Sequence, residues 1–238
     1  MHSNFLFDLD QTLLNFHASE HKALKIVLEA NGLLFSDEIY KAFMEYNKSL
    51  WLELEKGLIS RTQLFDKRFS YIIERCGKDS SSFDRLKINS SFINTMSENG
   101  ILMDGALEFI QQIKKEIINS RIFIITNGAT INATGRIKST GLDKYIDGLF
   151  VSEDLGVSKP SAEYFDLVLQ KIAEPKESCI VIGDSLTSDM LGAKNAGLAS
   201  VWFMPQKDIE METAMNTYDI NFCASSFEEL FKILKEWA

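Results

Sequence analysis

Six short apolar runs restrict the fold of this chain more than any other feature of its sequence. The runs are rich in Val, Ile and Phe and show no polar alternation, which is typical of strands buried on both faces of a sheet. They span residues 5–7, 121–126, 148–152, 179–184, 199–203 and 221–225. Helical patterns lie between or after them, at residues 105–117, 162–173, 188–197 and 228–238. Strands that alternate with helices predict an α/β fold with a doubly wound parallel sheet.

Residues 15–100 interrupt this alternation, because they show helical periodicity and contain no good strand candidate. Three helices are expected there: residues 21–32 with Gly32 as C-cap, residues 37–57 ending at Gly57, and residues 60–73 from a capping box of Ser60 and Gln63. We therefore expect a Rossmann-like core of residues 1–14 and 101–238. An all-helical domain of residues 15–100 is inserted into this core after the first strand.

The charge balance and the cysteines exclude several classes of protein. The net charge of −9 repels a phosphate backbone, so we expect no nucleic-acid polymer as a partner. Cys76, Cys179 and Cys223 are too scattered for a disulfide framework or a CxxC metal site, and Cys179 is expected to be a small buried residue.

The hydropathy of the chain gives no sign of a membrane or a secretory protein. No apolar run approaches the ~20 residues that span a bilayer. Asp8 and Asp10 interrupt the amino-terminal apolar stretch too early for a signal peptide. We expect a cytoplasmic monomer or homodimer.

The first apolar run leads directly into Asp8 and Asp10, in the stretch FLFDLDQTLL. In open parallel sheets, ligands bind beyond the carboxyl ends of the strands. Both acids point towards one side, because side-chain direction repeats every two residues in a strand. Two close carboxylates repel each other unless a cation lies between them or one holds a proton. The pair is therefore a candidate catalytic or metal site, and the alternative is a turn with a helix N-cap.

Polar residues close two further segments of the predicted core. Thr126, Asn127 and Gly128 end the second core strand, where a hydroxyl and backbone N–H groups could hold an oxyanion or simply cap a helix. Lys159 precedes Pro160 at the start of a helix, where it could reach a bound phosphate or remain a solvated surface lysine.

The run CIVIGD leads into a fourth polar group. Asp184 ends this run, and Asp189 lies on the next helix. The Asp184 carboxylate suits Mg²⁺, which prefers oxygen ligands, provided that it converges with Asp8. An Asp or Ser N-cap is the alternative. Four polar groups at the strand ends of one predicted sheet favour a shared site.

These four groups resemble the motifs of the haloacid dehalogenase (HAD) superfamily of hydrolases. Its D-x-D-x-[TV] motif corresponds to residues 8–12, where Gln11 replaces a common glycine and affects turn geometry rather than chemistry. Thr126 and Lys159 correspond to the second and third motifs, and Gly183–Asp189 resembles the G-D-S-x-x-x-D motif. The resemblance covers essentially the whole chain, and the helical insert corresponds to the cap domain that many members carry.

The insert carries a closer resemblance. The stretch NKSLWLELEKGLISRTQLFDKRF, residues 47–69, is similar to the cap of bacterial HAD pyrimidine 5′-nucleotidases. This similarity implies a Mg²⁺-dependent phosphomonoester hydrolase. Its expected substrate and partner is a small phosphorylated metabolite, a pyrimidine nucleoside monophosphate.

The resemblance also implies a role for each core motif. Asp8 is the expected nucleophile that forms an aspartyl-phosphate, and Asp10 is the expected acid and base. Mg²⁺ is expected on the carboxylates of Asp8 and Asp184 and on the backbone carbonyl of Asp10. The remaining roles are phosphate binding by Thr126, Asn127, Gly128 and Lys159, and orientation of Lys159 or a metal-bound water by Asp189.

Four residues of the insert are candidates for substrate contact: His17, Asn47, Trp51 and Arg68. For Trp51, packing inside the cap is favoured over stacking on a base. For Arg68, a structural ion pair is favoured over substrate contact. His17 and His21 are four residues apart on an expected helix, but a zinc site would need more ligands nearby.

Other functions of the same core stay open. A different cap chemistry would give a sugar-phosphate or phosphoglycolate-type phosphatase, or a phosphomutase. A dehalogenase is disfavoured, because halide displacement needs neither an acid such as Asp10 nor a metal carboxylate such as Asp184. A catalytically silent member that only binds phosphorylated ligands is disfavoured because all four motifs are intact.

Overall fold

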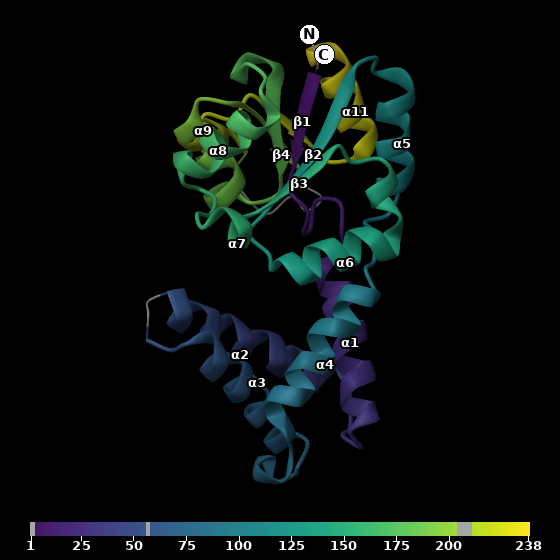
Figure 1. Ribbon diagram of the computed structural model, residues 1–238, viewed down its shortest axis with the longest axis vertical. Coiled ribbons are helices and arrows are strands. Elements are labelled where there is room, and N and C mark those ends of the chain that lie inside the picture. The colour runs from purple at the N-terminus through teal and green to yellow at the C-terminus, as the bar shows by residue number, and fades with distance from the viewer. Residues whose placement is uncertain (1–2, 56–57, 204–210) are drawn as a thin grey trace. The chain divides into compact units, whose positions relative to one another are not determined.

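The computed structural model describes residues 3–55, 58–203 and 211–238. The chain divides into two compact units. Unit 1 comprises Met1–Phe16 and Gly100–Ala238, and unit 2 comprises His17–Asn99. Figure 1 shows the elements of both units.

Unit 1 is built on a six-stranded parallel sheet with the strand order β3-β2-β1-β4-β5-β6. The strands are β1 Ser3–Phe7, β2 Ser120–Thr126, β3 Gly148–Val151, β4 Cys179–Gly183, β5 Ala199–Phe203 and β6 Phe222–Ala224. Each strand overlaps one of the predicted apolar runs. The predicted doubly wound α/β fold is therefore confirmed.

Helices cover both faces of this sheet, because side chains on each strand alternate between the faces. Phe5 and Phe7 of β1 belong to one apolar cluster, and Leu6 belongs to the other. The first cluster includes α5 Ala106–Glu116, α6 Thr130–Thr140 and α11 Phe227–Trp237, and the second includes α8 Ala162–Ile172, α9 Leu191–Ala196 and α10 Met211–Tyr218. The short helix α7, Ser152–Leu155, follows β3. Figure 1 shows α5 and α11 on one side of the sheet and α8 and α9 on the other.

The strand order reverses beside β1, which lies near the centre of the sheet. The chain adds β2 and β3 on one side of β1 and then crosses to β4 on its other side. Ligands of doubly wound sheets bind at such a switch point, beyond the carboxyl ends of the strands. The fold therefore predicts a ligand site among the residues that follow β1 and β4.

The helix predicted at residues 188–197 is shorter and begins differently in the structure. A π-helical turn, Leu186–Met190, comes first, and α9 follows it. Ser185 caps this turn, since its side chain accepts a hydrogen bond from the Ser188 N–H at 3.2 Å. Single π turns are frequent at functional sites.

Unit 2 is all helical, as the periodicity predicts. Its helices are α1 Phe16–Ala30, which begins one residue before the unit, α2 Asp37–Glu55, α3 Arg61–Arg75 and α4 Arg85–Glu98. The predicted capping box is confirmed, because Ser60 Oγ accepts from Gln63 N at 3.2 Å and Ser60 N donates to Gln63 Oε1 at 2.8 Å. Gly32 has the left-handed φ of +68° expected after a helix end, whereas Gly57 lies outside the described residues.

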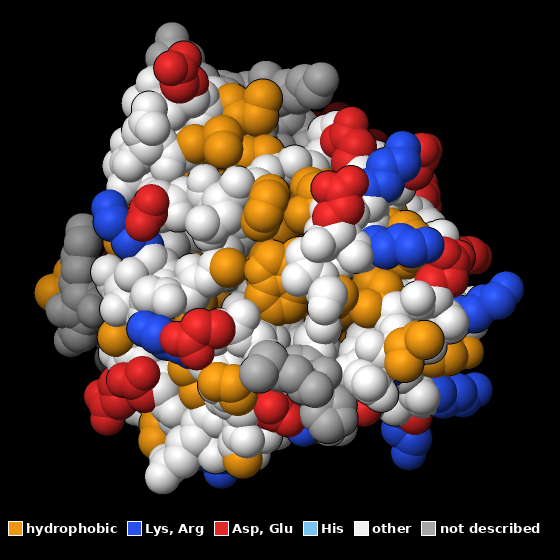
Figure 2. Space-filling model, turned by 90° about the horizontal axis from the view of Figure 1, so that it is seen from above, with side chains coloured by type: hydrophobic (Ala, Val, Ile, Leu, Met, Phe, Trp, Pro, Cys, Tyr) orange, Lys and Arg blue, Asp and Glu red, His pale blue; other side chains and the backbone are white. Residues whose placement is uncertain are grey.

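Three features of the described residues bear on the expectations from the sequence: the surface charges, the helices and the buried cysteine. In Figure 2, acidic and basic side chains are interspersed on the face that is shown. Within the described ranges, no helix combines the length and the apolar character needed to cross a membrane. Cys179 is fully buried, as predicted.

Candidate active site

Asp8 and Asp184 follow two strands that are hydrogen-bonded to each other. Phe7 at the end of β1 pairs with Ile182 of β4, and the Asp8 N–H donates to the Ile182 carbonyl at 2.8 Å. The acids therefore leave the sheet side by side. Their carboxylate oxygens and that of Asp189 lie within 4.8 Å of one another. This geometry meets the condition that Asp184 converges with Asp8.

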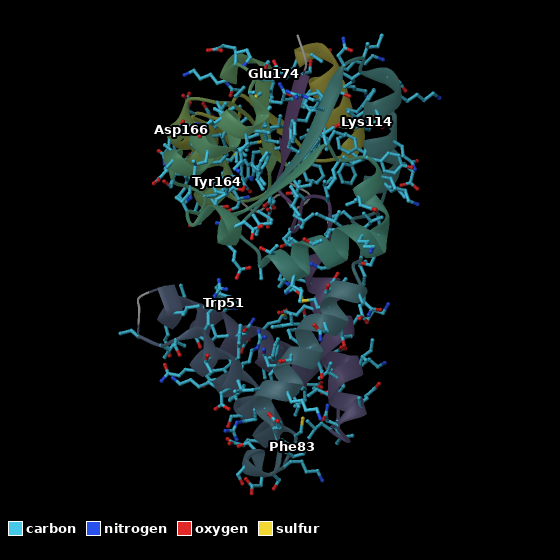
Figure 3. The ribbon with its side chains drawn as sticks, in the orientation of Figure 1. Trp51, Phe83, Lys114, Tyr164, Asp166 and Glu174 are labelled. Carbon is cyan, nitrogen blue, oxygen red and sulfur yellow. The ribbon has the colours of Figure 1, made fainter. Side chains whose placement is uncertain are left out.

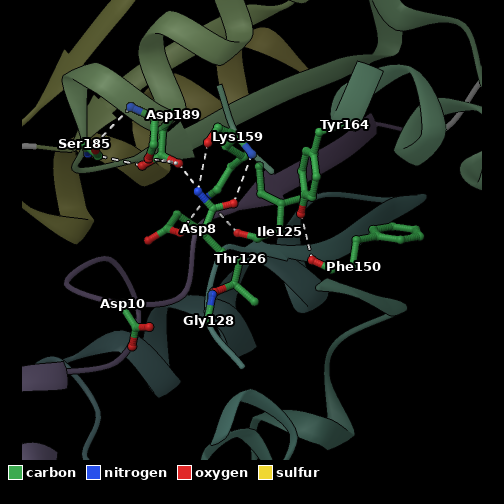
Figure 4. Close-up of polar contacts among 12 residues, drawn as sticks. Asp8, Asp10, Ile125, Thr126, Gly128, Phe150, Lys159, Tyr164, Ser185 and Asp189 are labelled. Atoms are coloured by element: carbon green, nitrogen blue, oxygen red, sulfur yellow. Dashed lines mark hydrogen bonds and ion pairs between the residues drawn. The ribbon is translucent and has the colours of Figure 1, made fainter. Parts of the chain in front are cut away.

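Lys159 lies at the centre of this cluster and is almost completely buried. Its Nζ donates to Asp8 Oδ1 at 2.6 Å, to Asp189 Oδ1 at 2.6 Å and to the Ile125 carbonyl at 3.0 Å (Figure 4). Asn127 holds the backbone of Lys159, because its amide donates to the Lys159 carbonyl at 2.9 Å and accepts from the Lys159 N–H at 3.0 Å. The interpretation of Lys159 as a solvated surface residue is wrong.

Three carboxylates and one ammonium group meet in this cluster, and their burial shifts their pKa values. Burial raises the pKa of Asp8 well above its usual value, although Lys159 opposes this shift. Burial also raises the pKa of Asp184 to about 6, and the charge of Asp189 adds to that shift. Burial alone would lower the pKa of Lys159, but the charges of Asp189 and Asp8 raise it above its ordinary value.

Carboxylate oxygens at this spacing fit a hard divalent cation. Mg²⁺ binds through one or two carboxylates and keeps several waters. Burial chiefly raises the pKa values of Asp8 and Asp184, and a bound cation would favour their ionised forms. Among the described residues, Asp8, Asp184 and Asp189 are the group with this potential. The residues present therefore fit the predicted metal. The carboxylate of Asp10 lies outside this group.

Asp189 is held from three sides on the π turn. Besides Lys159, the Ser185 N–H donates to Asp189 Oδ2 at 3.1 Å, and the Ser188 hydroxyl donates to Oδ1 at 3.4 Å. The strand end leaves room for this carboxylate only because residue 183 is glycine. A Cβ on Gly183 would lie 2.7 Å from the Cβ of Asp189.

The loop after β2 does not cap the following helix. The N-cap of α6 is Ala129, which has no side chain able to cap, so the capping interpretation of Thr126 and Asn127 is wrong. Thr126 is buried, and its Oγ1 accepts from the Gly128 N–H at 3.0 Å. The loop Thr126–Gly128 therefore makes a tight turn. It lies beside Lys159, because Asn127 is hydrogen-bonded to the Lys159 backbone.

Asp10 has a partner that the sequence analysis did not anticipate. Both carboxylate oxygens of Asp10 pair with the guanidinium of Arg136 on α6, Oδ1 with Nη1 and Oδ2 with Nη2, the latter at 3.1 Å. Arg136 is buried. The sequence contains a signal for this burial, because Arg136 lies on the same helical face as the apolar residues Ala133 and Ile137. A buried arginine needs an anionic partner.

The four candidate residues of unit 2 do not share one environment. Arg68 is buried, and its guanidinium donates to Asn89 Oδ1 through Nε at 2.8 Å and to Asn47 Oδ1 through Nη1 at 3.3 Å. Four aromatic rings surround it at 5.0 to 5.9 Å, those of Phe43, Phe65, Phe69 and Phe92. Burial lowers the pKa of Arg68 to about 10.

Trp51 differs from its favoured interpretation, and the two histidines have other partners within unit 2. Trp51 on α2 is 38% exposed, so its interpretation as a core residue of the cap is wrong (Figure 3). The carbonyl of His17 accepts from the Tyr40 hydroxyl at 2.9 Å. The ring of His21 packs edge-on against Phe35 and Tyr40, at 4.9 and 4.7 Å between centroids, which gives no support to a zinc site.

Comparisons with known proteins agree with this geometry. A family model described as haloacid dehalogenase-like hydrolase matches residues 3–197. The pyrimidine 5′-nucleotidase YjjG of Escherichia coli is 33% identical over 229 residues, which are 96% of each chain. The pyrimidine 5′-nucleotidase PynA of Streptococcus pneumoniae is 32% identical over 216 residues, which are 90% of this chain and 89% of that protein.

The chain also matches solved structures over almost its whole length. The HAD-hydrolase YfnB from Bacillus subtilis, in a crystal structure bound to magnesium, is 29% identical to this chain. It has a TM-score of 0.83, and the match covers 98% of both chains.

Proposed function

Because the chain is a phosphatase of the haloacid dehalogenase-like hydrolase family, we propose that it is a Mg²⁺-dependent 5′-nucleotidase for pyrimidine nucleoside monophosphates. The convergence of Asp8, Asp184 and Lys159 beyond adjacent strands carries this proposal. Two relatives that are pyrimidine 5′-nucleotidases support the choice of substrate. The proposed partner is thus a small metabolite rather than a nucleic-acid polymer, and the proposed state is a cytoplasmic monomer or homodimer.

Asp8 and Asp10 divide the chemical work in this proposal. A carboxylate oxygen of Asp8 attacks phosphorus, the bond to the ester oxygen breaks, and that oxygen leaves with a proton from Asp10. Water then attacks the phosphorus of the aspartyl-phosphate and gives a proton to Asp10. The bond between phosphorus and Asp8 breaks, which returns both acids to their starting state.

Lys159 acts chiefly through its charge. Its ammonium has three protons, and three protein oxygens already accept them. Lys159 therefore orients Asp8 and offsets the charge of an approaching phosphate without a further hydrogen bond. The Thr126 hydroxyl and the backbone N–H of Asn127 are the proposed ligands of a phosphoryl oxygen, and the missing side chain of Gly128 leaves room for it.

Mg²⁺ would be held by the carboxylates of Asp8 and Asp184 and by the backbone carbonyl of Asp10. When bound, the ion neutralises charge that builds up on the phosphoryl oxygens. Asp189 is committed to Lys159 and to the Ser185 N–H, so it orients the lysine rather than binding the ion.

Unit 2 corresponds to the proposed cap, which would enclose the leaving group and exclude water. His17, Asn47 and Trp51 are its proposed contacts to the substrate. Arg68 acts through Asn47, because its buried guanidinium donates to the amide oxygen and thereby orients the amide.

A panel of phosphomonoesters tests the substrate class. With Mg²⁺ present, dUMP, dTMP and UMP should be hydrolysed faster than purine nucleotides, hexose phosphates or phosphoglycolate. A chelator should stop all of these reactions. If a purine nucleotide or a sugar phosphate is preferred by about tenfold in kcat/KM, the nucleotidase assignment is wrong and another phosphatase or mutase function applies.

The substitution Asp8→Asn tests the nucleophile. It removes the attacking carboxylate and keeps the shape of the side chain, so phosphate release should fall to background while the fold is retained. Asp143→Asn is a matched control, since Asp143 is an exposed acid of the same unit. Turnover near that of the wild type in Asp8→Asn would reject Asp8 as the nucleophile.

A further inference from the structure

Among the described residues of unit 1, Arg136 is a buried cation that the proposed mechanism does not use. Its side chain is 1% exposed, yet it carries a full positive charge. Such burial is costly unless the charge is paired and hydrogen-bonded. The guanidinium meets this need through Asp10, with which it forms a two-pronged ion pair. A planar fork of this kind fixes the orientation of a carboxylate, which a single lysine charge cannot do.

The surroundings of Arg136 hold the guanidinium in place. Its Nε donates to the Asn132 carbonyl at 3.3 Å, and the ring of Phe16 lies under the guanidinium at 5.5 Å. Gly100 packs against the same helical turn, because a Cβ there would lie 2.8 Å from the Arg136 carbonyl. The Arg136 side chain is therefore held by a carbonyl of its own helix and by the Phe16 ring, and the backbone of Arg136 packs against Gly100.

The two oxygens of Asp10 have different surroundings. Oδ2 has the longer contact to the guanidinium, 3.1 Å, and faces the loop after β2. A Cβ on Gly128 would lie 3.8 Å from this Oδ2 and 3.2 Å from the Thr126 hydroxyl. Oδ1 instead bonds Nη1 of Arg136. Both oxygens thus bond the guanidinium, and Oδ2 is the one that also lies next to the loop that is proposed to bind phosphate.

We propose that Arg136 is a positioning residue that holds Asp10 by Oδ1 and directs its Oδ2 towards the ester oxygen that leaves. This inference rests on the proposed phosphatase mechanism. In it, the proton on Oδ2 passes to the leaving oxygen as its bond to phosphorus breaks, and the Nη1 bond to Oδ1 persists throughout. In this proposal Arg136 does not contact the substrate, and it acts only through the Asp10 carboxylate.

The leaving group provides the test, because an acid matters most when the leaving oxygen is strongly basic. The substrates are p-nitrophenyl phosphate, whose leaving group needs little protonation, and the best alkyl phosphomonoester of the panel above. The parameter is kcat/KM, which reports on phosphoryl transfer to Asp8. We expect Arg136→Gln to lower kcat/KM for the alkyl ester on the order of 100-fold, the effect of a misplaced catalytic group, and to change that for p-nitrophenyl phosphate far less.

Two further variants separate positioning from folding. Arg136→Lys keeps the charge but loses the fork, so it should show the same selective loss to a smaller degree even if Arg136→Gln fails to fold. Arg121→Gln is the matched control, because Arg121 pairs with Glu174 at 3.1 Å elsewhere in unit 1 and should leave both rates unchanged.

A double variant provides the sharpest comparison. In an Asp10→Asn background, adding Arg136→Lys should cause no further loss with the alkyl ester, because the group that is positioned has gone. Two results would show a purely structural role and overturn the inference. The first is an equal loss of kcat/KM for both substrates in the Arg136 variants. The second is a loss from Arg136→Lys in the Asp10→Asn background as large as its loss in the wild type. A wild-type protein that hydrolyses neither substrate would instead overturn the proposed function itself.

Discussion

The candidate site depends on single side chains that balance one another in a dry environment. Lys159 and Asp189 are both almost fully buried, and the lysine is the cation between Asp189 and Asp8. Removing one member of such a group costs more than the ion pair itself contributes, because it leaves a charge buried without a partner. The residues of this site are therefore expected to matter for stability as well as for activity.

Substitution of the lysine tests this dependence. Lys159→Met should lower the free energy of unfolding by about 3–5 kcal/mol in metal-free buffer, because two carboxylates lose their cation. Denaturant titration measures the change. The control is Lys114→Met, whose ion pair with Asp147 at 2.5 Å is partly exposed and should contribute about 1 kcal/mol or less (Lys114 is labelled in Figure 3). Equal effects of the two substitutions would contradict the interpretation.

Glycine at position 183 gives a second test at the same scale. Gly183→Ala forces the new methyl group against Asp189, so the acid or the strand end must shift. We expect a loss of about 1–3 kcal/mol in stability, as for other overpacked sites, together with reduced phosphatase activity. Thermal unfolding and kcat/KM measure the two effects. A variant that is unchanged in both would show that the turn adapts without cost.

At the scale of elements, some helix ends follow local capping signals, and others are set by side-chain contacts in the candidate site. The start of α3 follows its local signal, since Ser60 and Gln63 satisfy each other's backbone N–H groups. The segment after β4 does not form a plain α-helix, because Asp189 bonds Lys159 and the Ser185 N–H within a π turn. The local sequence pattern therefore predicts the start of α3 correctly. It fails after β4, where side chains of the segment form contacts within the candidate site.

The capping box can be tested alone. Ser60→Ala removes the acceptor for the Gln63 N–H and should destabilise unit 2 by about 1 kcal/mol. Ser90→Ala is the matched control, because Ser90 is an exposed residue inside α4, where alanine is the better helix former. Denaturant titration should show a loss for the first variant and no loss for the second. The reverse order would refute the capping argument.

At the scale of the whole molecule, the acidic cluster links stability to pH and metal. The folded state raises the pKa of Asp184 from 3.8 to about 6 through burial and the charge of Asp189. Between these values, the folded chain binds more protons at this site than the unfolded chain. The free energy of unfolding therefore falls as pH rises from about 4 to 6, by on the order of 3 kcal/mol from this group. Asp8 contributes in the same direction.

This linkage predicts the behaviour of the metal-free protein. Asp184→Asn should be more stable than the wild type at pH 7 and should show a shallower loss of stability between pH 4 and 6. Mg²⁺ should raise the Tm of the wild type at pH 7, because it binds the folded state, and should have little effect on the variant. Thermal unfolding with Mg²⁺ or chelator measures both effects. An equal Mg²⁺ shift in the variant would exclude Asp184 as a ligand.

The sequence by itself determined the features that short segments encode. Apolar runs without alternation defined all six strands, and the positions of Asp8, Thr126 and Asp184 at strand ends followed from them. The helical nature of unit 2 and the capping box at Ser60 were also readable, because periodicity and caps involve residues a few positions apart.

Only the tertiary structure decided which of these residues meet. The contact between Lys159 and Asp8 joins residues 151 positions apart, and that between Arg136 and Asp10 joins residues 126 positions apart. The exposure of Trp51 and the burial of Arg68 likewise depend on how helices pack. Local pattern specifies which face of an element is apolar, but strand order and helix packing determine which side chains share a buried space, and therefore which charges must pair.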